Sequence, residues 1–258
     1  DDQSGENILE VTGPFAGIVG AGSDNLVVKA ASKFQAATGN AAERPYHLKL
    51  EKNLPVASGL GGGSADAAAT LLALAYFHGI EKKTDLGQIA KEIGADVPMC
   101  LESRLLRATG TGTDIKSLRN EASYPAVLVN PRIPLSTPDV FKALENKTNP
   151  AIDIEDGAID MKSLQGLRND LEGPAIKLAP QIKDVLTFIE DCPGCLFSRM
   201  SGSGTTCFGI FGSEDDAREA AARVSKARPE WWCVETTLIS WDIRERIRFV
   251  KSEADIDE

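Results

Sequence analysis

The stretch PVASGLGGGSADAAATLLALA, residues 55–75, decides the fold. Four of the five positions 59–63 are glycine, and an alanine-rich segment of good helix formers follows at once. The first backbone N–H groups of a helix lack intrahelical partners and carry a partial positive charge, so they attract anions. Glycines leave no Cβ to keep a bulky anion from the backbone, and Ser64 adds a hydroxyl. The stretch therefore predicts a phosphate-binding loop that leads into a helix.

Other interpretations of this stretch fit less well. A flexible linker is rarely followed directly by a run of helix formers. A P-loop requires Gly-Lys-Ser/Thr after the glycines, and the dinucleotide-binding fingerprint requires G-x-G-x-x-G; GLGGGS contains neither. A second cluster, RMSGSGTTCF at 199–208, is by itself explained as a tight turn between two strands. Together with the first loop, its residues Gly202, Ser203 and Gly204 would form the other wall of one phosphate cleft.

Composition narrows the class of protein. The 258 residues are 42% hydrophobic and 26% charged, as in globular proteins, and the net charge of −10 argues against general attraction to nucleic acid or anionic membranes. No apolar run approaches the roughly 20 residues that span a bilayer, and the acidic start resembles no signal or transit peptide. The five cysteines are an odd, scattered set, so we expect a reducing cytoplasm and interpret CPGC at 192–195 as a turn.

Periodicity and capping residues predict an irregular mixture of strands and helices, hence an α+β protein without regular β-α-β alternation. The expected strands are 7–15, 46–53, 98–109, 124–130, 195–201, 205–212 and 231–239. The expected helices are 23–39 (N-cap Ser23 or Asp24, stop Gly39), one from the glycine loop to about Gly79, 84–94 (cap Thr84), 137–145, 167–178, 180–190 and 213–227 (cap Ser213). The turn 110–114 follows the third strand, and the acidic end 251–258 is expected to fray. We place a domain boundary near 117–124, giving domains 1–120 and 121–258.

Two motifs in this order resemble the GHMP superfamily, the small-molecule kinases named for galactose, homoserine, mevalonate and phosphomevalonate. LPVASGLGGGSADAA is similar to its central P-x-x-x-G-L-G-x-S-S motif, and RMSGSGTTCFGIF to its C-terminal glycine motif. Within the superfamily, the blocks IGADVPMC, PLSTPDVFKAL and RNDLEGPA resemble the family of 4-diphosphocytidyl-2-C-methyl-D-erythritol kinases of non-mevalonate isoprenoid synthesis. The resemblance implies a two-domain fold, with a ribosomal S5 domain 2-like N-terminal and a ferredoxin-like C-terminal domain.

The resemblance also implies site residues, a nucleotide and a metal. Asp96 corresponds to the catalytic aspartate, and Thr137 and Phe141 to residues of the substrate pocket, with the Phe141 ring stacked on cytosine. ATP, with Mg²⁺ whose ligands are unknown, is the implied cofactor. Its binding residues would be Asn25 and Leu26 near the adenine, then Pro55, Gly59, Leu60, Gly61, Gly62, Gly63 and Ser64. The plain alternatives are a helix cap or salt-bridge partner for Asp96 and core packing for Phe141.

The family pattern is broken in three places. The chain does not show the family's first block, A-P-A-K-I-N-L with a D-G-Y-H segment, and we expect a piece of roughly 35–45 residues to be omitted, since a lost strand would leave a sheet edge unpaired. Ala65 replaces the second serine of the central motif and is followed by Asp66. The turn RATGTGTD stands where the family has G-x-G-E, which puts a role for that glutamate in doubt.

We expect a small-molecule substrate, no nucleic-acid or membrane partner, and a monomer or homodimer. Three alternatives stay open: a homoserine- or mevalonate-type kinase, a ligand sensor that kept the fold but lost catalysis, and an interaction domain with an accidental glycine loop. The STPDVF block favours a substrate with a base, because a small acid needs no stacking ring.

Overall fold

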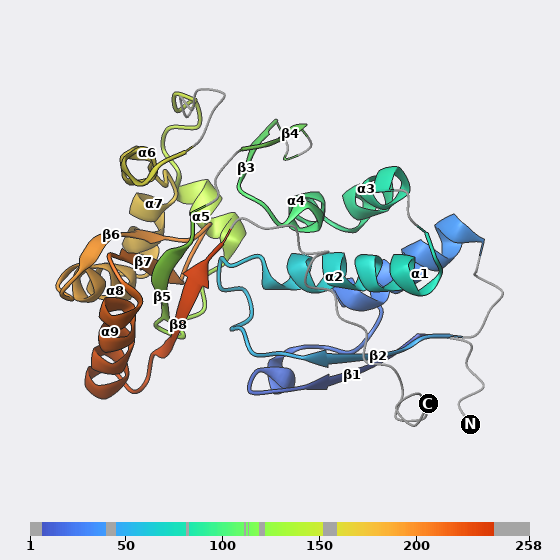
Figure 1. Ribbon diagram of the computed structural model, residues 1–258, viewed down its shortest axis with the longest axis horizontal. Helices are drawn as coiled ribbons and strands as arrows, with labels where there is room; N and C mark the ends of the chain where they lie inside the picture. Colours follow the sequence, from blue (N-terminus) through green and yellow to red (C-terminus); the bar gives the residue numbers. More distant parts are fainter. Residues whose placement is uncertain are drawn as a thin grey trace.

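The computed structural model describes residues 7–39, 45–80, 83–110, 112, 114–118, 122–151 and 159–239. The acidic end at 251–258 and the expected boundary between residues 120 and 121 lie outside these ranges. Figure 1 shows two groups of elements side by side. No helix in the described ranges is long and apolar enough to cross a lipid bilayer.

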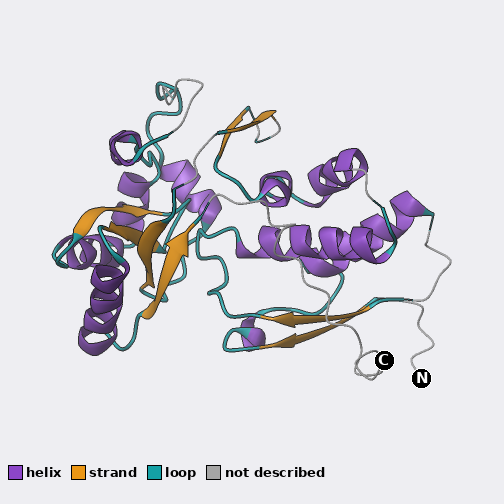
Figure 2. Ribbon diagram, in the orientation of Figure 1, coloured by secondary structure: helices purple, strands orange, loops and turns teal. Residues whose placement is uncertain are grey.

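The first group places helices over a small parallel sheet. Strands β1 (Ile8–Thr12) and β2 (His47–Glu51) pair in parallel, and α1 (Leu26–Thr38) is the crossover between them, after the short 3-10 helix η1 (Ala16–Ile18). Helices α2 (Gly62–Phe77), α3 (Lys83–Ile93) and α4 (Val97–Glu102) complete the helical layer (Figure 2). A hairpin of β3 (Leu106–Thr109) and β4 (Asp114–Ser117) follows α4.

Helix α2 is central to this group, which explains its composition. It is apolar on nearly every side, and helices of that kind belong in a core. Alanines let neighbouring helices approach closely, and Ala67 and Leu71 have no exposed surface. The core around α2 contains Ala30, Ala31, Phe34, Ala67, Ala68, Leu71, Leu72, Leu74, Ala75, Leu86, Ile89, Ala90, Val97 and Leu101.

The second group is an antiparallel sheet backed by two helices. The strands β5 (Tyr124–Asn130), β6 (Cys195–Met200), β7 (Cys207–Phe211) and β8 (Trp232–Leu238) lie in the order β6-β7-β5-β8. With α8 (Gln181–Glu190) before β6 and α9 (Glu214–Ala227) before β8, the chain follows the β-α-β-β-α-β pattern of a ferredoxin-like domain. The remaining helices, α5 (Thr137–Ala143), α6 (Met161–Gly166) and α7 (Glu172–Leu178), lie between β5 and α8.

Hydrophobic periodicity determines which faces pack in this sheet domain. On α8 the buried residues Ile182, Val185, Leu186 and Ile189 recur at helical spacing, so one face covers the sheet. Their partners include Val127 and Val129 of β5, both with no exposed surface. The ferredoxin-like prediction is therefore confirmed.

Most expected elements are present, but four expectations are wrong. The expected strand 98–109 is helix α4 followed by β3, because Pro98 lies in the first turn of a helix whose Val97 and Leu101 are buried one turn apart. Helix α1 is capped by Asn25, not Ser23 or Asp24, since the Asn25 side chain accepts a hydrogen bond from Val27 N.

The other two concern helix starts. Helix α3 begins at Lys83, so Thr84 lies inside the helix and does not cap it. Helix α7 begins at Glu172 rather than at residue 167, because Asn169 uses its side-chain oxygen to bind Leu171 N. Gly39 and Ser213 do terminate and cap their helices as expected, with Gly39 left-handed at φ 76°.

Candidate active site

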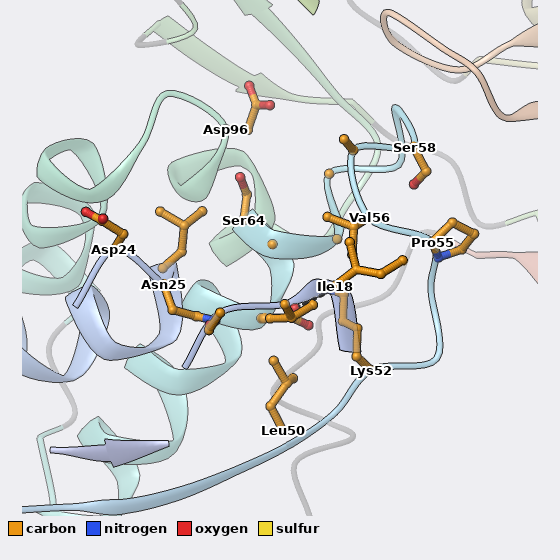
Figure 3. Close-up of a pocket in the computed structure, with 18 of the residues that line it drawn as sticks. Ile18, Asp24, Asn25, Leu50, Lys52, Pro55, Val56, Ser58, Ser64 and Asp96 are labelled. Atoms are coloured by element: carbon orange, nitrogen blue, oxygen red, sulfur yellow. Dashed lines mark hydrogen bonds and ion pairs between the residues drawn. The ribbon is translucent and has the colours of Figure 1, made fainter. Parts of the chain in front are cut away.

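The glycine loop lies in a cavity of about 840 Å³ that residues of both groups line. Its walls come from the segment after η1, the start of α1, the end of β2, the glycine loop, Asp96, and Thr137, Gly202 and Ser203 of the second group. Figure 3 shows Ser64 and Asn25 between Asp96 and Leu50 in that view. The cavity thus brings the starts of α1 and α2 together with Gly202 and Ser203, which lie more than 100 positions later in the chain.

Three of the four glycines of the first loop have a physical reason that the structure shows. Gly59 has φ +78°, and a Cβ there would lie 2.3 Å from Ser201 O. Gly61 has φ +65° and open space around its Cβ position, so backbone conformation alone favours glycine in the empty cavity. At Gly62 a Cβ would lie 3.2 Å from Lys52 Nζ. The loop therefore has a defined, packed conformation, and the interpretation of this stretch as a flexible linker is ruled out.

The start of α2 presents backbone amides to the cavity. Gly61 is the N-cap residue, no side chain caps the helix, and the first intrahelical bond runs from Ala65 N to Gly61 O. The N–H groups of Gly62, Gly63 and Ser64 precede that bond, and all three residues line the cavity. A 16-residue helix adds its dipole to these donors. This end of the cavity is suited to an anion.

Lys52 forms a largely buried ion pair beneath the loop. Its Nζ lies 2.5 Å from Asp66 Oδ2, with 7% of the Lys52 side chain and 23% of the Asp66 side chain exposed. Lys52 is the only basic residue among the described residues that line the cavity, where Asp24, Asp66 and Asp96 are acidic. Because Asp66 neutralises Lys52, the backbone amides at the start of α2 are the main source of positive potential for a phosphate among the described residues that line the cavity.

Asn25 shapes the rim of the cavity at the start of α1. Its Oδ1 accepts from Val27 N at 2.9 Å, and its Nδ2 donates to Gly20 O at 2.7 Å. One side chain therefore caps the helix and closes the loop before it. Asn25 and Leu26 both line the cavity, as do Ile18 and Val56, which are exposed apolar side chains.

Asp96 presents an uncommitted carboxylate to the cavity. It is the N-cap residue of α4 but makes no capping hydrogen bond, and it forms no ion pair with a described residue. This excludes a helix cap, and it excludes a salt bridge to any residue that the structure describes. It is exposed rather than buried. One turn later, burial raises the pKa of Cys100 to about 11, assisted by the charges of Asp96 and Asp66, so that thiol stays protonated at neutral pH.

The second glycine loop packs directly against the first. Ser201 Oγ donates to Gly59 O at 2.9 Å, and Thr206 N donates to Ser58 O at 3.1 Å. Gly202 and Ser203 line the same cavity, and Ser203 Oγ lies 2.7 Å from Thr137 Oγ1. The loop is thus both the tight turn between β6 and β7 and a wall of the cavity.

Most of the predicted site residues line this one cavity. Those that do are Asn25, Leu26, Pro55, Gly59, Gly61, Gly62, Gly63, Ser64, Asp96, Thr137, Gly202 and Ser203. Three do not: Leu60, Gly204 and Phe141. Gly204 is buried behind the loop, where a Cβ would lie 2.8 Å from Met200 Sδ. Phe141 is 52% exposed, which rules out core packing, while the buried residue of α5 is Val140.

Sequence reasoning missed the Lys52–Asp66 pair and the apolar rim residue Ile18. Asp66 stands out only as the residue after Ala65, and nothing in the spacing of positions 52 and 66 predicts their contact. The described residues also contain no group of three or more His, Cys, Asp or Glu side chains that could hold a metal ion by themselves. A cation held by these described residues would therefore need further ligands, such as the oxygens of a bound anion.

Comparison with known proteins defines the class. The family model "GHMP kinases N terminal domain" matches residues 25–104, and "GHMP kinases C terminal" matches residues 140–230. A crystal structure of homoserine kinase from Cytophaga hutchinsonii, 20% identical, covers 93% of this chain and 84% of that chain with a TM-score of 0.70, which shows the shared fold. The chain belongs to the GHMP kinase superfamily and has its fold.

More similar relatives narrow the family. A 4-diphosphocytidyl-2-C-methyl-D-erythritol kinase of Sinorhizobium medicae is 47% identical over 217 residues, 81% of this chain and 71% of the relative. A kinase of the same name from Cereibacter sphaeroides is 44% identical over 239 residues, 90% of this chain and 82% of the relative. A crystal structure of 4-(cytidine 5'-diphospho)-2C-methyl-D-erythritol kinase, 34% identical, covers 92% of this chain and 84% of that chain with a TM-score of 0.74. The chain belongs to the 4-diphosphocytidyl-2-C-methyl-D-erythritol kinase family.

Proposed function

We propose that this protein transfers the γ-phosphoryl group of ATP to the 2-hydroxyl of 4-diphosphocytidyl-2-C-methyl-D-erythritol. The observation that carries the proposal is the meeting of the α2 amides and the Asp96 carboxylate in one cavity. The relatives' names supply the acceptor, and the cavity supplies a place for anion and alcohol together. The proposed setting is non-mevalonate isoprenoid synthesis in a reducing cytoplasm, in keeping with five free cysteines.

Phosphoryl transfer needs alignment and charge stabilisation more than covalent help. The acceptor oxygen attacks the γ-phosphorus, the bond to the β–γ bridging oxygen breaks, and the hydroxyl proton passes to the Asp96 carboxylate, which can also orient the hydroxyl. The amides of Gly62, Gly63 and Ser64 hold the phosphates. Asn25 and Leu26 lie nearer the base, at the start of α1.

The oxygen donors in the cavity fit Mg²⁺ that arrives with the nucleotide. Mg²⁺ prefers oxygen ligands, keeps several waters, and is commonly bound by one or two carboxylates plus substrate phosphates. Ser64 would supply a hydroxyl to it, while Asp96 serves the acceptor hydroxyl and Asp66 is already paired with Lys52. The ion would offset part of the negative charge of the phosphates.

Thr137 and Phe141 are the proposed acceptor-side residues. Thr137 begins α5 and reaches the cavity, where its hydroxyl contacts Ser203. The exposed Phe141 ring lies one helical turn further along α5 and is available to stack on a base. A cytidine group would therefore lie along α5, outside the phosphate cavity.

Competing acceptors test this proposal. The purified protein with Mg²⁺ and ATP is assayed against 4-diphosphocytidyl-2-C-methyl-D-erythritol, homoserine and mevalonate, with ADP release and phosphorylated product both measured. We expect product only from the cytidine-linked acceptor. Product from homoserine or mevalonate instead would contradict the substrate assignment, and ATP binding without transfer to any acceptor would favour a sensor.

A further inference from the structure

The second glycine loop needs contacts from other segments to hold one conformation, because its glycines place little restriction on the backbone. Gly202 and Gly204 have φ values of +54° and +90°, a region that only glycine enters freely. The loop follows β6, which is an edge strand with one side lacking a neighbouring strand. A turn of this kind at a sheet edge holds one conformation only where other groups fix it.

The segment RNDLEGPA, residues 168–175, supplies that support. Asn169 Nδ2 donates to Met200 O and to Gly202 O, both at 2.8 Å. Glu172 Oε2 accepts from Met200 N at 2.8 Å. Two side chains of one segment therefore bind both backbone groups of Met200 and one carbonyl of the loop itself.

The orientation of the Asn169 amide is fixed by its own partners. Its Oδ1 accepts from Leu171 N at 3.0 Å, just before α7, while its Nδ2 faces two carbonyl oxygens. A flipped amide would place oxygen against those carbonyls, so only one assignment satisfies the network. Half-burial of Asn169 strengthens these bonds relative to a fully solvated site.

The hydrogen bond from Asn169 to Gly202 O connects the segment just before α7 to the cavity wall. Gly202 lines the cavity and packs on the first loop, where a Cβ at Gly202 would lie 2.9 Å from Gly59 O. Its neighbour Ser203 contacts Thr137. A shift of this turn would therefore disturb the contact between the two glycine loops.

We propose that Asn169 is a positioning residue for nucleotide binding: it holds the turn at Gly202 against Gly59 and so fixes the far wall of the phosphate cavity. This inference rests on the proposed nucleotide site. Asn169 does not touch the nucleotide and does not line the cavity. Its effect is transmitted through the backbone of the second glycine loop.

The test measures the dissociation constant of a non-hydrolysable ATP analogue with Mg²⁺ by calorimetry. Asn169→Leu, similar in size but without the amide, is expected to raise that constant about tenfold, the scale of one or two lost hydrogen bonds. The matched control is Gln165→Leu, because Gln165 Nε2 donates to Leu196 O of the same strand, away from the loop. The control is expected to bind within about twofold of the unmodified protein.

Each outcome has a distinct meaning. A folded Asn169→Leu protein that binds the analogue as the unmodified protein does would overturn the inference, and so would an equal loss in Gln165→Leu. An unmodified protein that fails to bind the analogue would instead contradict the proposed function.

A second variant covers the case in which Asn169→Leu does not fold. Asn169→Asp keeps the acceptor for Leu171 N but offers the two carbonyls a donor only when the carboxyl is protonated. At neutral pH the ionised carboxylate offers no donor and places a second oxygen against the two carbonyls, so Asn169→Asp is expected to weaken analogue binding at least as much as Asn169→Leu. A folded Asn169→Asp protein that binds the analogue as the unmodified protein does would overturn the inference.

Discussion

At the residue scale, the proposed phosphoryl transfer depends on whether the Asp96 carboxylate is available to accept a proton. Its carboxylate lines the cavity and makes neither a capping bond nor an ion pair with a described residue. A free carboxylate beside anion-binding amides is the arrangement that a proton acceptor for an alcohol requires. The assignment of that role to Asp96 is a prediction that kinetics can test.

We expect Asp96→Asn to lower kcat by at least about 100-fold while leaving ATP affinity largely intact, in the range of lost general-base catalysis. Steady-state kinetics and calorimetry with the ATP analogue measure the two effects. Asp24→Asn is the matched control, because Asp24 lines the same cavity and the variant removes the same charge. Near-normal turnover in Asp96→Asn would remove Asp96 from the mechanism.

Phe141 gives a second prediction at this scale. Because its ring is 52% exposed, Phe141→Ala should change the free energy of unfolding by less than about 0.5 kcal/mol. Lost stacking should weaken acceptor binding by about 1–3 kcal/mol. Phe77→Ala, at a ring that is 74% exposed on α2, serves as control and should affect neither. If acceptor binding is unchanged in Phe141→Ala, the ring has no substrate role.

At the element scale, the glycine loop and the start of α2 act as one unit. The loop is shaped by its contact with the second loop on one side and by Lys52 on the other, and the helix then directs its amides into the cavity. Helix α1 contributes a second helix start through the Asn25 cap. Two helix N-termini facing one cavity suit a polyanionic guest.

Gly59→Ala and Gly61→Ala separate the two functions of the loop. At Gly59 the added methyl would meet Ser201 O at 2.3 Å, so we expect both lower stability and weaker ATP binding. At Gly61 the methyl meets no protein atom, so stability should fall by only about 1–2 kcal/mol from backbone strain. The same methyl lies where the phosphate is proposed to bind, and ATP affinity should drop at least tenfold, or about 1.4 kcal/mol.

Urea unfolding and calorimetry measure both quantities for each variant. The control is Gly87→Ala on α3, where nothing lies within 4 Å and nucleotide affinity should be unchanged. Normal ATP affinity in Gly61→Ala would show that the open space beside Gly61 is not the phosphate position.

At the scale of the whole molecule, the half-buried thiols of Cys195 and Cys233 predict a loss of stability in alkali. Burial raises the pKa of Cys195 to about 11 and of Cys233 to about 12, from the ordinary 9.0. The folded state therefore favours the neutral thiol, and its contribution is complete below the unfolded pKa and declines as pH rises towards the folded value.

We expect the urea midpoint of the unmodified protein to fall between pH 9 and 11. The double variant Cys195→Ala with Cys233→Ala should lose less stability across the same window, which separates thiols from the lysines and tyrosines that also titrate there. Parallel pH curves for the two proteins would show that these thiols make no such contribution.

The sequence predicts local features of this molecule better than its long-range contacts. Strands β1 and β2, helix α2 and the Ser213 cap follow from alternation, glycine chemistry and short-range capping. The sequence pattern predicts a strand where helix α4 lies, because six residues are too few to show helical periodicity. The side chains of Lys52 and Asn169 act on residues that only the folded chain brings near.

The same limit applies to the candidate site. The glycine loop, Asp96 and Thr137, which the motif resemblance implies as site residues, line one cavity, and their roles stay predictions. The resemblance did not indicate that Lys52 is neutralised by Asp66, which leaves backbone amides as the main donors to a phosphate in the part of the cavity wall that the structure describes. Because Lys52 is paired in this way, the proposed phosphate site depends mainly on the start of α2.

A crystal structure with Mg²⁺ and a non-hydrolysable ATP analogue tests this central claim most directly. We predict phosphate oxygens within hydrogen-bonding distance, about 2.7–3.2 Å, of the backbone nitrogens of Gly62, Gly63 or Ser64. A well-ordered analogue whose triphosphate lies away from these amides would contradict the account.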